Sequence, residues 1–148
     1  MLAATAEIDV ECTPSVAAEV LWDVGAYPDF LSDVLEVEVH DLPEGRQAVF
    51  QVRVFRARQF RVGLVRDQGH GLRWHLIAGE HLRDLQGSWT VLDVAPGLTR
   101  LTYALHVDLD FAIPDAIARR FTEFGLPTVM RQFKARMETV AALEELTR

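Results

Sequence analysis

The sequence predicts an α+β fold in which a curved, seven-stranded antiparallel sheet wraps a long C-terminal helix, with two short helices between the first and second strands. Apolar and polar residues alternate with a period of 2 through most of residues 1–111, which is typical of strands that have one buried face. From Pro114 the apolar period changes to 3.6, which indicates a helix. Because 148 residues suit one domain, we expect residues 1–148 to share a single core.

The first strand and the two short helices are predicted from the first 31 residues. Apolar residues alternate with acidic ones from Ala6 to Cys12. Thr13 is then suited to cap a helix, and Pro14 is tolerated at the first helical position. We expect this helix to end at Gly25. A second short helix or turn follows at 27–31, where a proline again fits only near a start.

Six further runs of alternating residues predict the rest of the sheet. Short turns rich in glycine and proline separate them, so that consecutive strands pair antiparallel. The predicted strands are 35–40, 48–54, 60–66, 72–76, 85–91 and 101–111.

The C-terminal helix carries two apolar stripes. One contains Phe121 and its neighbours, and the other contains Phe133 and its neighbours. Twelve residues separate these two, which is roughly 1200° of rotation, so the stripes are out of phase by about 120°. Between them lies Gly125-Leu126-Pro127, and a proline removes a helical hydrogen bond. We therefore expect a kink or a break at this point.

Charge is distributed unevenly along the chain. The net charge is −7, yet residues 1–45 contain 11 acidic residues and no Lys or Arg, whereas the stretch from Arg46 to Arg66 contains six arginines and no acid. The acidic total argues against nucleic-acid binding, which depends on phosphate neutralisation. The arginine stretch would suit an anionic lipid surface or a protein partner, or it would simply be a basic hairpin beside an acidic strand.

Several classes of protein and site lack support in the sequence. No apolar stretch is long enough to span a membrane, and the first ten residues have no basic residue, so a cytoplasmic protein is expected. Cys12 is the one cysteine, and no two histidines have metal-binding helical spacing, so we expect no metal. No nucleotide or hydrolase motif occurs, and no cofactor is expected. His81 with Glu80 and Asp84 is either an acid/base group or a solvated loop.

Large aromatic residues and a methionine share the inward side of the predicted strands and helix. Such residues build an adaptable ligand pocket, and they equally build a solid core, so both interpretations stay open. The candidate ligand-binding residues are Phe50, Phe60, Trp74, Trp89, Tyr103, Phe121, Phe124, Met130 and Phe133.

Two polar residues share that inward side and are the candidates for catalysis. Arg66 ends its strand, where its guanidinium would meet a ligand carboxylate, phenolate or carbonyl at the rim of a pocket, or would turn to solvent. Tyr103 has a hydroxyl that requires a partner, either a ligand or a structural hydrogen bond.

The sequence resembles the START/Bet v 1-like (SRPBCC) superfamily, and within it the polyketide cyclase/dehydrase and Coq10-like group. The similarity rests on Thr13–Val24 (Thr-Pro followed by apolar residues and Trp-Asp-Val), Tyr27-Pro28-Asp29-Phe30-Leu31, Gly87-Ser88-Trp89-Thr90 and Ala118-Arg119-Arg120-Phe121. The resemblance implies a helix-grip fold with a hydrophobic cavity between the sheet and the long helix. Its members bind lipids, isoprenoid quinones or polyketide intermediates, and some are aromatase/cyclases.

The resemblance also bears on the candidate residues. Cyclases of this group resemble the chain in having an arginine late in the fourth strand, as Arg66 is here. They have a tyrosine shortly after the second helix, where this chain has Val34, and this departure weakens the case for cyclase chemistry. The branch linked to ribosome binding is disfavoured by the net charge of −7.

These observations lead to two functional hypotheses. The first is a cytoplasmic protein that binds a hydrophobic small molecule (a lipid, an isoprenoid quinone or a polyketide-like aromatic) without nucleic acid, with a transient membrane-surface contact, as a monomer or a homodimer. The second is an aromatase/cyclase acting on a poly-β-keto chain, in which Arg66 stabilises an enolate and Tyr103 or a water relays protons. A protein-interaction module that uses the arginine stretch stays open as a third class.

Overall fold

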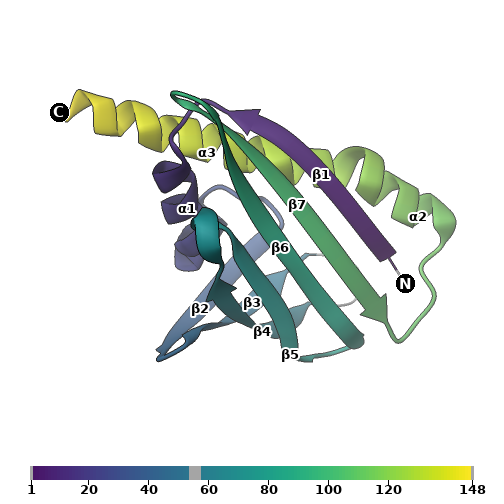
Figure 1. Cartoon of the computed structure of the whole chain (residues 1–148). Coiled ribbons are helices and arrows are strands. Elements are labelled where there is room, and N and C mark those ends of the chain that lie inside the picture. The colour runs from purple at the N-terminus through teal and green to yellow at the C-terminus, as the bar shows by residue number, and fades with distance from the viewer. Residues whose placement is uncertain (1, 54–57, 148) are drawn as a thin grey trace.

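Seven antiparallel strands form one sheet in the order β1-β7-β6-β5-β4-β3-β2 (Figure 1). The structure is a computed structural model that describes residues 2–53 and 58–147, so Val54 of the third predicted strand and Arg56 of the arginine stretch lie outside the described residues. The strands are β1 (Leu2–Val10), β2 (Val34–Leu42), β3 (Gly45–Val52), β4 (Gln59–Arg66), β5 (Leu72–Gly79), β6 (Leu82–Ala95) and β7 (Leu98–Leu109). The predicted antiparallel sheet is confirmed.

The first strand lies beside the last one. β1 pairs with β7 along its whole length, from Leu2 opposite Val107 to Val10 opposite Thr99. Every other neighbour in the sheet is also a neighbour in the sequence, joined by a short connection. The helical residues between β1 and β2 therefore carry the chain from one edge of the sheet to the other.

The two short helices are α1 (Pro14–Trp22) and η1, a 3₁₀ helix (Val24–Asp29). The predicted cap is confirmed, because the Thr13 hydroxyl accepts a hydrogen bond from a backbone N–H in the first turn. The expectation that α1 ends at Gly25 is wrong. The helix ends three residues earlier because Asp23 leaves the helical region (φ −79°, ψ 64°).

The sheet is strongly curved (Figure 1). Its register shifts between Arg61 and Val62, between Leu82 and Asp84, and between Asp93 and Ala95. Each such irregularity bends a strand and increases its twist. β6 and β7, the longest strands, are thereby curved around the helix that follows them.

One helical segment closes the chain: α2 (Asp115–Arg120), a π-helical turn η3 (Phe121–Gly125) and α3 (Leu126–Leu146). The predicted interruption near Pro127 takes the form of the π turn and not of a break. The Leu126 amide donates to the Phe121 carbonyl five residues earlier, and Pro127 has no amide hydrogen to continue the ordinary pattern. The segment as a whole lies across the concave face of the sheet (Figure 1).

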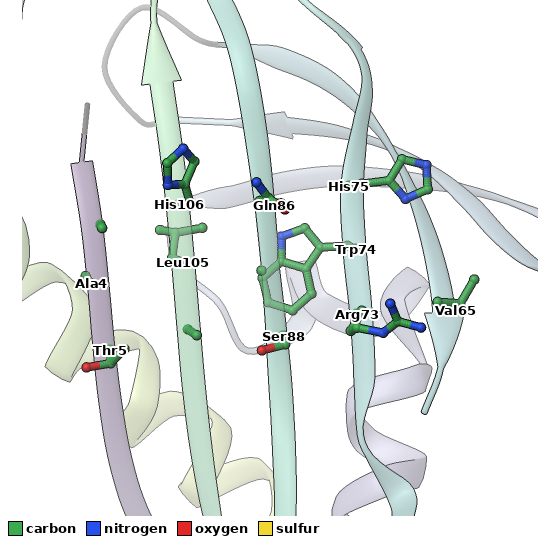
Figure 2. A pocket seen from close by; sticks show the side chains of 13 residues that line it. Ala4, Thr5, Val65, Arg73, Trp74, His75, Gln86, Ser88, Leu105 and His106 are labelled. Carbon is green, nitrogen blue, oxygen red and sulfur yellow. The ribbon is translucent and has the colours of Figure 1, made fainter. Parts of the chain in front are cut away.

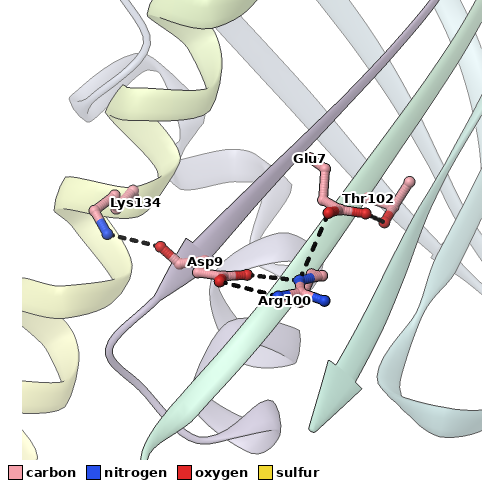
Figure 3. A network of polar contacts seen from close by, with 5 residues as sticks. All are labelled: Glu7, Asp9, Arg100, Thr102 and Lys134. Carbon is pink, nitrogen blue, oxygen red and sulfur yellow. Dashed lines mark hydrogen bonds and ion pairs between the residues drawn. The ribbon is translucent and has the colours of Figure 1, made fainter. Parts of the chain in front are cut away.

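The middle of α3 is fixed to the β1–β7 edge by polar contacts (Figure 3). The Lys134 ammonium donates to the Asp9 backbone carbonyl at 2.7 Å. The Asp9 carboxylate in turn accepts two hydrogen bonds from the Arg100 guanidinium, at 2.8 and 3.2 Å. Nearby, a carboxylate oxygen of Glu138 accepts the Glu11 backbone N–H at 2.8 Å. These contacts hold the middle of the helix against the first strand.

The core forms where α3 and α1 meet the sheet. From α3 it takes Met130, Phe133 and Met137, all 3% exposed or less. From α1 it takes Leu21, which is fully buried. The arrangement of a curved antiparallel sheet around a long C-terminal helix is the helix-grip fold. Among the described residues, no helix is both long and apolar enough to cross a bilayer.

Candidate functional site

A cavity of about 560 Å³ lies between the concave face of the sheet and the C-terminal helical segment. Strands β3 to β7 supply most of its wall, and the helical segment supplies the opposite side. Its lining includes Ile117 and Phe124, which are 45% and 65% exposed, so the cavity reaches the molecular surface beside α2 and η3. The interior is therefore hollow and open at one end. Hollows of this volume accommodate small-molecule ligands.

Aromatic rings form much of the cavity wall. Trp74 and Trp89 both contact Tyr103, with ring centroids 5.5 and 4.8 Å apart. On the neighbouring strands, Phe50 and Phe60 are stacked at 5.1 Å. Because successive inward positions of β3 to β7 bring these side chains together, the wall offers flat π faces to an apolar guest.

The Tyr103 hydroxyl is the polar group within this wall. Burial raises its pKa, so it is a neutral donor and acceptor at ordinary pH. No hydrogen bond joins it to another described residue, although every enclosed side-chain nitrogen or oxygen in the described part of the chain has a partner. Its oxygen is thus reachable from the cavity. Tyr27, which also lines the cavity, differs because its hydroxyl donates to the Leu21 carbonyl at 2.5 Å.

One continuous face of the C-terminal helical segment lines the cavity, on both sides of the π turn. Phe121 and Phe133 both lie on it, although the sequence places them about 120° apart on a regular helix. A π turn contains about one residue more than an ordinary turn, so the rotation between residues on its two sides is reduced by roughly 100°. The offset thereby falls to about 20°. The π turn accordingly brings the two predicted stripes onto the same side.

Polar and charged groups gather at the open end. Asp33, Arg53 and Arg120 belong to the lining, and all three are exposed. The Arg53 amide donates to the Asp33 carbonyl at 2.9 Å, which joins the end of β3 to the segment after η1. The Gln132 side-chain amide donates to the Ser32 hydroxyl at 3.0 Å and joins α3 to the same segment. The cavity therefore has an apolar interior and a polar mouth.

A second hollow, about 540 Å³, lies on the other face of the sheet (Figure 2). It is a groove across β1, β7, β6 and β5, where outward side chains such as Ala104 and Ser88 are small. Arg73, His75 and His106 border it. Arg73 is paired with Asp67 at 2.7 Å. This groove is more open than the inner cavity, and a smaller share of its lining surface is apolar.

The structure brings most of the predicted ligand-binding residues together. Lining the cavity are Phe50, Phe60, Trp74, Trp89, Tyr103, Phe121, Phe124 and Phe133. Met130 was expected with them but does not line the cavity. It is 3% exposed and lies in the solid core, because it is about 100° further around the helix than Val129, which does line the cavity.

Arg66 also lies elsewhere than expected. It is exposed and absent from the cavity lining, and its guanidinium lies 4.6 Å from the centre of the Trp22 ring. Arg46 lies over the same ring at 4.7 Å and donates to the Trp22 carbonyl. β4 ends at Arg66, so the side chain is free to turn toward the aromatic face offered by the end of α1. Among the described arginines of the stretch, Arg46 and Arg66 therefore share the Trp22 ring, whereas Arg53 lines the cavity.

Sequence reasoning missed Arg53 and Arg120 at the mouth. The alternating pattern predicts that Arg53 points to the outward face of the sheet. In the structure, Arg53 follows the last residue of β3 at the end of the sheet and lines the cavity. For Arg120, the spacing of residues along the helix could have predicted its position at the mouth. It is three residues after Ile117 and four before Phe124, so it shares their helix face.

Three histidines, His40, His81 and His106, lie within ion-pair distance of a carboxylate. His81 pairs with Asp110 at 3.2 Å, and not with the Glu80 and Asp84 expected from the sequence. Asp84 instead lies 3.6 Å from His106. Within residues 2–53 and 58–147, no three His, Cys, Asp or Glu side chains are grouped as metal ligands are.

Comparison with known proteins supports this description. Residues 10–134 match the protein family described as polyketide cyclase / dehydrase and lipid transport. A START superfamily protein from Mycobacterium smegmatis is similar in structure, with a TM-score of 0.82, 15% identity and coverage of 93% of this chain and 98% of that one. The Zhui aromatase/cyclase from Streptomyces sp. R1128 is also similar, with a TM-score of 0.69, 18% identity and coverage of 97% and 93%. Among curated proteins, no sequence matches.

Proposed function

Because the chain belongs to the polyketide cyclase / dehydrase and lipid transport family, we propose that it binds a hydrophobic small molecule in the cavity between the sheet and the C-terminal helix. The observation that carries this proposal is the cavity of about 560 Å³, whose interior is walled by aromatic and aliphatic side chains. Binding there requires no catalytic group. Removal of apolar surface from water, at roughly 25 cal/mol per Å², supplies the affinity.

The wall favours a ligand that has flat or unsaturated parts. The Trp74, Trp89 and Tyr103 rings lie side by side, and such faces pack well against other rings and against planar isoprenoid or polyketide units. The Tyr103 hydroxyl supplies one neutral hydrogen bond inside the cavity. Lipids, isoprenoid quinones of the kind suggested by the Coq10-like resemblance, and polyketide-like aromatics all have this chemistry.

The test is to block the cavity and leave the outer groove intact, and then to do the reverse. Val62 is 2% exposed and lines the cavity, whereas Val65 of the same strand lines the outer groove. We expect Val62→Trp to weaken uptake of the neutral fluorescent probe N-phenyl-1-naphthylamine by about tenfold or more, because the indole occupies the ligand's space. Val65→Trp should change it by less than about twofold.

Native mass spectrometry of the protein as purified, before and after organic extraction, provides the second measurement. A bound apolar molecule that the extraction removes supports the proposal. Wild-type protein that neither carries nor takes up any apolar molecule would contradict it, and so would a loss of uptake in Val65→Trp alone.

We also propose a transient contact of the cavity mouth with a membrane surface. Ile117 and Phe124 are large apolar residues that remain 45% and 65% exposed beside the opening. A lipid surface would cover them and supply the ligand directly. Co-sedimentation with phosphatidylglycerol vesicles that decreases in an Ile117→Ser/Phe124→Ser variant tests this contact.

A cyclase reaction is the second candidate function. It is favoured by the Tyr103 hydroxyl, which faces the cavity, and by the likeness in fold to an aromatase/cyclase. Tyr103, in contact with any bound substrate, would donate a hydrogen bond to a substrate oxygen. Arg66 would act only on a part of the substrate that leaves the cavity, since it lies over Trp22. A Tyr103→Phe variant that produces the same product pattern at the same rate as the wild type would exclude Tyr103 from such a reaction.

A further inference from the structure

The interior of the cavity has no charged lining. Among the described residues that line it, the charged side chains are Asp33, Arg53 and Arg120, and all three are exposed. An ionised ligand group placed among the interior rings would lose its hydration without a partner, which is strongly unfavourable. Any charge on the ligand therefore has to lie at the mouth.

Two guanidinium groups border that mouth from different elements. Arg53 directly follows β3, and Arg120 is the last residue of α2. No carboxylate of a described residue lies within ion-pair distance of either one, whereas Arg46, Arg73 and Arg100 each pair with an aspartate. Both mouth arginines are thus available to a ligand.

The remaining charge at the mouth is the Asp33 carboxylate, which makes no ion pair with a described residue. Two cations and one anion leave a net charge of +1 at the opening. A cationic ligand group would meet more repulsion than attraction at the opening. A neutral ligand group would form no ion pair with either guanidinium, and both would stay hydrated. An oxyanion would accept charge-assisted hydrogen bonds from the planar guanidinium forks.

We propose that the ligand is an anionic amphiphile, with its apolar body in the cavity and its carboxylate or phosphate between Arg53 and Arg120. This inference rests on the proposed function, since it assigns the head-group chemistry of the same site. It also gives the ligand a direction: the apolar end enters first and lies against Trp89 and Tyr103, and the oxyanion stays at the surface.

Three probes of equal chain length test the proposal: decanol, decanoate and decyl phosphate, each titrated calorimetrically at pH 7.5. In low salt we expect the anionic probes to bind about tenfold more tightly than decanol, because exposed ion pairs contribute modestly. In 0.5 M NaCl this preference should fall to less than about threefold. A larger preference for decanoate assigns a carboxylate head group, and a larger preference for decyl phosphate assigns a phosphoryl one.

Variants then test whether the two arginines cause the preference. Arg53→Gln and Arg120→Gln should each reduce it about threefold, and in the double variant the anionic probes should bind no more tightly than decanol. Arg119→Gln is the matched control, because Arg119 is adjacent on the same exposed helix but does not line the cavity. It should retain the preference, and thermal unfolding of each variant verifies that it is folded.

The outcomes separate this proposal from the proposed function. Equal affinity of wild-type protein for decanol and both anions would overturn the anionic head group and leave apolar ligand binding in place. An equal loss of preference in Arg119→Gln and Arg120→Gln would overturn the two-arginine site in favour of the general field of the protein. Failure of all three probes to bind would overturn the proposed function together with this inference.

Discussion

Two parts of the C-terminal helical segment share one helical path but differ in what they bury. α3 buries Leu126, Met130, Phe133 and Met137, and polar contacts fix it to β1. The lid segment, defined as α2 and η3 (residues 115–125), contains no buried residue. It nevertheless contributes Ile117, Arg120, Phe121 and Phe124 to the cavity lining. Of these two parts, α3 therefore contributes more to the stability of the fold, and the lid segment lies where the cavity opens.

This difference has a physical origin in the amount of apolar surface that each part removes from water. A residue buried in the core contributes both transfer free energy and close packing. A residue such as Phe124, 65% exposed, contributes little of either in the ligand-free protein. Segments that make few buried contacts open with low free energy. The lid segment is thus suited to move when a ligand enters, and α3 is suited to stay in place.

The largest expected effect separates the two parts by stability. Met137 is fully buried, and Met137→Ala should lower the free energy of unfolding by about 3 kcal/mol, because it leaves a hole that the core fills only in part. Phe124→Ala, in the lid segment, should change it by less than about 0.5 kcal/mol. Chemical denaturation of both variants measures the comparison. Similar losses in the two variants would show that the lid segment is part of the cooperative core.

A second prediction concerns the π turn, and its effect appears in ligand binding. Deletion of Glu123, an exposed residue outside the cavity lining, should convert η3 to ordinary helix and rotate α2 by about 100° relative to α3. Ile117 and Phe121 would then leave the cavity wall. Loss of roughly 50 Å² of apolar contact corresponds to about tenfold weaker binding of a neutral probe.

Stability and helix content distinguish a rotated lid segment from one that has unfolded. Stability should change by less than about 1 kcal/mol, since no buried residue is removed. Circular dichroism should show at least as much helix as in the wild type. Undiminished probe binding would indicate that the phase of the lid segment does not matter to the site.

The π turn also shows which parts of the fold could be predicted from the sequence and which could not. The alternation of the strands predicted the sheet, because one face of each strand must be apolar and the period of 2 is visible residue by residue. The two helical stripes were visible too, together with their offset of about 120°. The proline between the stripes predicted a kink or a break at Gly125-Leu126-Pro127. An extra residue in one turn removes the offset without a break, and only the backbone hydrogen bonds distinguish these solutions.

The candidate site could be predicted from the sequence where alternation along a strand determines which face of the sheet a side chain points to. Phe50, Trp89 and Tyr103 were placed on the inward side by alternation, and they line the cavity. Arg66 has the same inward side, yet it is at the end of β4, where the pleat no longer determines direction, and Trp22 supplies a closer surface. Arg53 reaches the cavity mouth for the corresponding reason at the end of β3. Strand ends are thus where the rule of alternation fails.

The smallest expected effect concerns the Asp9–Arg100 pair between β1 and β7, beside the Lys134 contact of α3, and appears as a dependence of stability on pH. The hydrogen bonds from Arg100 hold the pKa of Asp9 below its ordinary value. A carboxyl group whose pKa is lower in the folded protein stabilises the fold above its unfolded pKa, about 3.9, and this contribution disappears as the pH falls through the folded pKa. Asp9→Asn should therefore be less stable than the wild type at pH 6. The difference should shrink as the pH decreases below about 4.

The effect should be small because both partners face solvent, where salt and water screen the pair. Glu123→Gln is the matched control in the lid segment, since Glu123 is exposed and makes no ion pair with a described residue. Urea denaturation between pH 2.5 and 7 measures all three proteins. If Asp9→Asn and the wild type differ by the same amount at pH 3 and at pH 6, the carboxylate charge does not stabilise the contact between β1 and β7. The attachment of α3 should be unaffected in either case, because Lys134 bonds the Asp9 backbone carbonyl, which the substitution leaves intact.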